Sequence, residues 1–215
     1  MNASTVTPEP AEAAPADQRA ALYAWFATLY ARELSEAQLQ TWFSGAAEPL
    51  FDVLAQAGFA AEVQDMQGAI NALRDLPDAQ LELAADYTMC FLLDVKSSAL
   101  PYASCYLGEH KTLFGPEEKA MREKLERYGL GLDSNYPEAA DHLAIQLELL
   151  SWLAMTGKAL DEQELVASLL RWVPEFSQKC QTIVTQVAFY PALSRMLCRL
   201  LQEESAALTD LSPQN

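Results

Sequence analysis

Apolar residues recur every three or four positions along most of the chain, which is the period of an amphipathic α-helix. The first such stretch is expected to run from Asp17, as its N-cap, to about Glu33. Its apolar face consists of Leu22, Trp25, Phe26, Leu29 and Tyr30. Similar stripes follow to about residue 207, and no stretch is typical of a β-strand. The pattern predicts an all-α helical bundle of roughly eight to ten helices.

Local residue choices set the expected starts of several helices. Ser35 followed by Gln38 predicts a capping box at the start of a short helix. Proline is favoured in the first turn of a helix, so longer helices are expected to begin at Pro77, Pro116 and Pro137. The helix after Pro137 is apolar on nearly all sides, which predicts a central position in the bundle.

Two non-helical segments interrupt the pattern, at 94–108 and around 129–136. The second segment either divides the chain into two helical halves or is an ordinary loop within one bundle. If this segment divides the chain, the candidate hinge residues are Gly129, Gly131 and Asp133. The expected organisation is then a disordered lead-in at 1–16, an N-terminal half at 17–128, a hinge at 129–136, a C-terminal half at 137–208 and a frayed tail at 209–215.

The chain carries a formal net charge of −16, from 30 acidic and 14 Lys and Arg residues. Such a surface repels phosphate backbones and anionic lipids, so nucleic-acid binding through a basic patch is not expected. The charge either favours a basic partner or serves solubility alone. No apolar run is long enough to span a membrane, and residues 1–16 lack the features of a secretory signal. We therefore expect a cytoplasmic protein.

Motifs for common enzyme classes are missing from the sequence, which contains no dinucleotide fingerprint, phosphate loop or zinc-protease motif. Glu138 and His142 come nearest to a di-iron ligand pair but have the wrong spacing. No cofactor or metal is therefore expected. The four cysteines form no C-x-x-C pair and are expected to be mostly reduced core thiols; they are Cys90, Cys105, Cys180 and Cys198. A nucleophilic pair of Cys105 with His142 stays open, and with it a small helical enzyme that uses this pair or the carboxylates.

The segment Tyr136-Pro137-Glu138-Ala139-Ala140-Asp141-His142 combines a turn with two carboxylates and a histidine. Acidic residues in a first helical turn complement the helix dipole, so one interpretation is purely structural, with Asp141 and His142 as a solvent-facing capping pair. The other interpretation is a binding site.

With these residues the chain resembles the TorD/DmsD/NarJ family of redox-enzyme maturation chaperones, over about residues 17–201. The family has an E-P-x-D-H motif before an apolar helix, which reads E-A-A-D-H at 138–142 here, with Ala139 in place of the family's proline. It also has a proline-aromatic loop, here Leu100 to Ser104. Its late helices open with tryptophan and proline, here Trp172 and Pro174, and Phe189-Tyr190 follows.

The resemblance implies an all-helical, cytoplasmic chaperone that binds the twin-arginine signal peptide and the apo form of a molybdoenzyme. It implies protection of that client and help with insertion of its molybdenum cofactor. The TorD branch is the most similar, which implies trimethylamine-N-oxide reductase as the client. The implied signal-peptide-binding residues are Asp141, His142, Glu138, Pro101, Tyr102, Leu100 and Tyr136.

Two further properties come from the resemblance alone. Weak guanine nucleotide (GTP) binding is attributed to the family, although no phosphate loop supports it here. Some members exchange halves between protomers, which implies a domain-swapped homodimer with its hinge at 129–136. A generic acidic helical adaptor remains the third alternative, beside the chaperone and the small enzyme.

Overall fold

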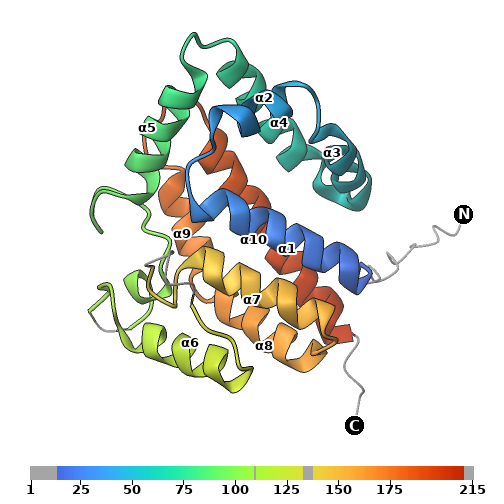
Figure 1. The fold of residues 1–215 in the computed structure, drawn as a ribbon, viewed down its shortest axis with the longest axis vertical. Coiled ribbons are helices and arrows are strands. Elements are labelled where there is room, and N and C mark those ends of the chain that lie inside the picture. Colours follow the sequence, from blue (N-terminus) through green and yellow to red (C-terminus); the bar gives the residue numbers. More distant parts are fainter. Residues whose placement is uncertain (1–13, 109, 133–137, 211–215) are drawn as a thin grey trace, which may run out of the picture.

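The computed structural model describes residues 14–108, 110–132 and 138–210 (Figure 1). The helices in these ranges are α1 (Ala16–Ala31), α2 (Glu36–Phe43), α3 (Glu48–Leu54), α4 (Ala60–Arg74), α5 (Ala79–Phe91), α6 (Pro116–Arg127), α7 (Leu143–Met155), α8 (Ala159–Leu170), α9 (Val173–Cys180) and α10 (Phe189–Asp210). A π-helical turn at Ala55–Phe59 joins α3 to α4, and a short 3₁₀ turn covers Ala103–Cys105. No strand occurs in the described ranges, where one isolated β-bridge is present. The predicted all-α fold class is confirmed.

Helix α7 lies at the centre of the bundle. Its leucines at 143, 147, 150 and 153 have no exposed surface. Helix α1 packs along α7, and α10 contacts α4, α8 and α9 (Figure 1). The central position predicted for the apolar helix is therefore correct, because its many apolar side chains are stable only where neighbouring helices bury them. Glu148 and Met155 are its exposed positions.

Some predicted helix starts are correct. Ser35 and Gln38 form the capping box at the start of α2. Pro116 occupies the first turn of α6. Helix α1 begins at Ala16, so Asp17 lies in its first turn and is not its N-cap.

The starts predicted at Pro77 and Pro137 are wrong. Helix α5 begins at Ala79, two residues after Pro77. Helix α7 begins only at Leu143, with His142 as its N-cap residue. The residues just before Leu143 hydrogen-bond to a distant loop, and these tertiary contacts replace the helical turn that the proline favours.

The predicted hinge at 129–136 falls within the chain between α6 and α7. Gly129 has φ +70°, and the backbone N–H groups of Gly129 and Leu130 donate to the carbonyls of Glu126 (2.9 Å) and Leu125 (3.0 Å), which ends α6. Gly131 follows, whereas Asp133 lies outside the described residues. Because α1 packs on α7, one buried core crosses the predicted boundary. The division into halves and the hinge stay predictions.

Candidate functional site

The loop at 100–105 and the turn at 138–142 lie side by side. Tyr102 and His142 form an antiparallel β-bridge. The backbone N–H of Ala103 donates to the Asp141 carbonyl at 3.2 Å, and that of Leu143 donates to the Pro101 carbonyl at 2.8 Å. We call these two segments the loop–turn junction. It brings together the proline-aromatic loop and the E-A-A-D-H segment, which lie more than 30 residues apart in the sequence.

Asp141 is buried at the centre of this junction, with 1% of its surface exposed. Its Oδ2 accepts the backbone N–H of Ser104 at 2.8 Å, and its carbonyl accepts the Gln146 side-chain amide at 2.7 Å. Its Oδ1 has no hydrogen-bond partner among the described residues. Burial raises the pKa of this carboxyl above its usual value. In this conformation Asp141 connects the loop to the turn, and it does not present a carboxylate to solvent.

His142 is also buried, with 3% of its surface exposed. Its Nδ1 accepts the backbone N–H of Ala144 at 3.1 Å, so the imidazole caps α7. The Tyr102 ring meets the imidazole edge to face, with the ring centres 4.8 Å apart. Burial lowers the pKa of His142 to about 3, so the ring is neutral at physiological pH. A solvent-facing Asp141–His142 pair, as the structural interpretation expected, is therefore not what forms.

Cys105 lies in the same junction but does not form an activated nucleophile. Burial raises the pKa of its thiol to about 11. A reactive cysteine needs a lowered pKa and a protonated or basic histidine partner. Here burial raises the pKa of Cys105 and lowers that of His142, and each change is the opposite of what a reactive pair needs. Cys90, Cys105 and Cys180 are buried free thiols and Cys198 is a partly buried one, as predicted.

Glu138 is the junction carboxylate that is only partly buried. The Tyr102 hydroxyl donates to this carboxylate. Leu100 and Pro101, the first two residues of the loop, are buried. They anchor the loop in the protein and do not form its surface. Tyr136 lies outside the described residues. Among the described residues of the predicted site, Glu138 and Tyr102 are therefore the ones that form its surface.

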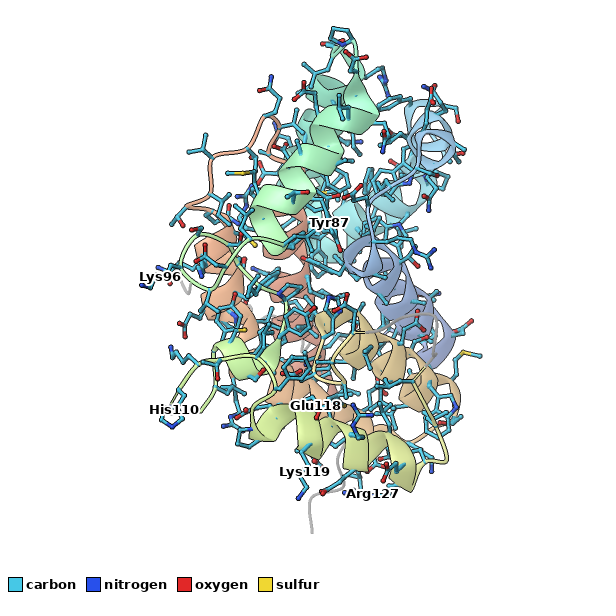
Figure 2. All side chains as sticks on the ribbon, turned by 60° about the vertical axis from the view of Figure 1, so that its left-hand side comes forward. Tyr87, Lys96, His110, Glu118, Lys119 and Arg127 are labelled. Atoms are coloured by element: carbon cyan, nitrogen blue, oxygen red, sulfur yellow. The ribbon has the colours of Figure 1, made fainter. Side chains whose placement is uncertain are left out.

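Glu33, just after α1, is a further exposed carboxylate that no sequence motif indicates. Tyr87 of α5 (labelled in Figure 2) donates its hydroxyl to the Tyr30 carbonyl at 3.0 Å, near the end of α1. Burial raises the pKa of Tyr87, and the negative charges of Glu138 and Glu33 raise it further. Both carboxylates therefore lie near enough to Tyr87 for their charge to act on its hydroxyl. Their positions are 105 residues apart in the sequence, and no local pattern connects them.

No group of three or more His, Cys, Asp or Glu side chains in the described ranges is placed to hold a metal ion. No helix there is long and apolar enough to cross a membrane.

Comparisons with known proteins agree with this architecture. The sequence profile of the nitrate reductase delta subunit family matches residues 52–180, more than half of the chain. A protein of Actinobacillus pleuropneumoniae named Chaperone protein TorD is 38% identical over 88% of this chain and 96% of its own length. A protein of the same name from Vibrio parahaemolyticus is 33% identical over 89% of this chain and 95% of its own length.

A solved structure from Archaeoglobus fulgidus, described as a redox enzyme maturation protein, has a similar fold. Its TM-score is 0.53 at 19% identity, and the match covers 93% of this chain and 99% of that one. At this identity the likeness concerns the fold alone. The profile match and the identities above 30% are decisive: the chain belongs to the TorD/NarJ family of maturation chaperones and is not an enzyme.

Proposed function

We propose that this chain is a cytoplasmic chaperone that binds the twin-arginine signal peptide and the apo form of a molybdoenzyme before export. The observation that carries the proposal is the loop–turn junction, which holds Glu138 beside Tyr102 at the surface. A carboxylate binds a guanidinium through two parallel hydrogen bonds, and an aromatic face stacks on it. Both parts of an arginine site are therefore present at one place.

The charge of the whole chain supports the same partner. A net charge of −16 attracts a peptide that carries two arginines, and this attraction raises the association rate. Glu33, whose charge acts on Tyr87 together with that of Glu138, is a candidate for the second carboxylate that the two cations of the peptide require. In this proposal Asp141 and His142 have a positioning role, because they hold in place the loop that carries Tyr102.

The relatives named TorD extend the proposal to the client. We take trimethylamine-N-oxide reductase as the client, and we assign protection of its apo form and assistance with molybdenum-cofactor insertion as the tasks. The chain contributes no phosphate-binding glycine loop, so the proposal includes no step that uses a guanine nucleotide.

Calorimetric titration of the purified chain with a synthetic twin-arginine signal peptide tests the proposal. We expect saturable binding at low salt that weakens as the ionic strength rises. A peptide with both arginines replaced by glutamine is expected to bind at least about tenfold more weakly. No binding at low salt would overturn the proposal. Equal binding of a scrambled basic peptide would instead support a generic acidic adaptor.

A further inference from the structure

A cleft between α1 and α3 lies apart from the loop–turn junction. It has a volume of about 480 Å³, and six of its seven lining residues are apolar. The lining residues are Gln18, Ala21, Leu22 and Trp25 of α1 and Leu50, Val53 and Leu54 of α3. In Figure 1, α3 lies on the opposite side of the bundle from α6, and α6 contacts the 3₁₀ turn of the junction.

Each wall of the cleft is a stripe with helical spacing. On α1 the lining positions are 18, 21, 22 and 25, and on α3 they are 50, 53 and 54. Apolar stripes that face each other normally pack directly, because protein interiors are close-packed. Here the two stripes stand apart, and Val53 keeps 58% of its surface exposed. An exposed apolar cleft of this kind is typical of an interaction site.

Helix α3 has room to adjust to a bound segment. On its other side it borders a second space, of about 220 Å³, which is lined by residues of α2, α3 and α4. The π-helical turn Ala55–Phe59 follows α3 directly, and such turns are frequent at functional sites. Within this turn Gly58 has φ +98°, and no atom lies within 4 Å of an added Cβ. The α3 wall is therefore not fixed by close packing on either side.

The charges around the cleft are negative. Asp17 directly precedes Gln18 and Asp52 directly precedes Val53, and both carboxylates are exposed. The stretch 33–73, which includes α2, α3 and most of α4, contains six acidic residues and no lysine or arginine. A second copy of the chain would bring the same carboxylates to the cleft and would be repelled. The cleft therefore fits a segment that is apolar on one face and carries basic residues beside that face.

We propose that the cleft between α1 and α3 binds an amphipathic helical segment in the mature part of the client, which is exposed in the apo form. The inference rests on the proposed function, and it adds a contact area that does not involve the signal peptide. At a rise of about 1.5 Å per residue, the α1 wall from Gln18 to Trp25 is about 10 Å long, which matches about two turns of a bound helix. Two separate contact areas let one chaperone hold the signal peptide and the mature part at the same time.

The test uses the full chain and two probes. One is the apo form of trimethylamine-N-oxide reductase without its signal peptide, and the other is the synthetic twin-arginine signal peptide. Val53→Glu places a charge in the cleft, and Val184→Glu, at a position that is 86% exposed, is its matched control. Val53→Glu is expected to weaken binding of the apo-enzyme about tenfold and to leave binding of the signal peptide unchanged. The Val184 variant is expected to bind both probes like the wild type.

Two further variants separate shape from charge. Ala21→Leu fills the cleft without adding a charge, and it is expected to weaken the apo-enzyme about fivefold, whereas Ala37→Leu on the exposed face of α2 is expected to be neutral. Asp17→Asn combined with Asp52→Asn is expected to weaken the apo-enzyme about threefold at low salt and to have little effect at high salt. Circular dichroism confirms that each variant is folded.

Several outcomes would overturn the inference while signal-peptide binding stands. One is unchanged binding of the apo-enzyme by the Val53 and Ala21 variants. Another is a wild type that binds the signal peptide and not the apo-enzyme. A third is a dimer that dissociates in the Val53 variant, because a second copy would then occupy the cleft. Failure of the wild type to bind either probe would instead overturn the proposed function itself.

Discussion

The backbone N–H of Ser104 donates to Asp141 Oδ2 at 2.8 Å, across 37 positions of sequence. This bond joins the loop at 100–105 to the turn before α7. It makes Asp141 a residue that positions the junction, and it leaves Glu138 as the junction carboxylate that a peptide can reach.

Asp141→Ala is expected to lower the free energy of unfolding by roughly 1–3 kcal/mol, because the buried Ser104 N–H loses its acceptor. Asp141→Asn keeps an acceptor oxygen at the same place and is expected to lose less. Urea denaturation of the three proteins measures the difference. Equal stability of all three would contradict the positioning role.

Glu138→Gln is expected to weaken binding of the twin-arginine peptide about fivefold to tenfold at low salt, because a charged acceptor for guanidinium is replaced by a neutral one. The loss is expected to shrink as salt screens the wild-type pair. Fluorescence anisotropy with a labelled peptide measures it, and Asp52→Asn serves as the control. If Glu138→Gln bound like the control, Glu138 would have no part in recognition.

A buried ionic cluster predicts a pH dependence of stability. Arg19 Nε and Nη2 donate to the Glu162 carboxylate at 2.9 and 3.0 Å, and Tyr23 donates to it at 3.3 Å. Glu204 of α10 lies 3.6 Å from Arg19 Nε, and its Oε2 accepts no hydrogen bond from a described residue. Burial raises the pKa of Glu204 to about 7, although Arg19 opposes the shift.

Because the folded pKa of Glu204 is above its unfolded value, the folded state holds this proton more tightly. The contribution of Glu204 to stability is therefore complete below about pH 4.5 and is lost as the pH rises to about 7. Glu204→Gln cannot ionise and therefore does not suffer this loss. We expect its free energy of unfolding, relative to that of the wild type, to increase by roughly 1–3 kcal/mol from pH 5 to pH 8. Chemical denaturation at both pH values measures the gain. A constant difference between the two proteins would contradict the assignment.

Gly129→Ala tests the end of α6. With φ at +70° and no atom within 4 Å of an added Cβ, the cost comes from the backbone alone. We expect a loss of about 1 kcal/mol in the free energy of unfolding. Gly131→Ala, with no positive φ and no nearby atom, is the control and is expected to be close to neutral. A loss of the same size in both variants would show that the φ of Gly129 is not the cause.

The helical stripes were enough to predict the all-α fold and the central position of α7, because both depend on periodicity and apolar content. The capping box of Ser35 and Gln38 is local, so it was also predictable. The start of α7 was not, since it depends on His142 as a cap and on bonds to a distant loop. Proline statistics describe a local preference, and the tertiary contacts outweigh it.

The residues of the candidate site could be selected from the sequence, but their burial and their mutual contacts could not. The sequence selected both segments of the junction, but the burial of Asp141 and His142 depends on how these segments meet. The same contact left Glu138 at the surface beside Tyr102. Glu33 was not predicted, because the effect on Tyr87 that it shares with Glu138 exists only in the folded chain.

A double-mutant cycle tests the central claim most directly, namely that Glu138 pairs with an arginine of the signal peptide. Wild-type chain and Glu138→Gln are each titrated with the twin-arginine peptide and with the two peptides in which one arginine is glutamine. We predict a coupling energy of about 1 kcal/mol or more between Glu138 and one of the two arginines. Strictly additive losses for both arginines would contradict the claim.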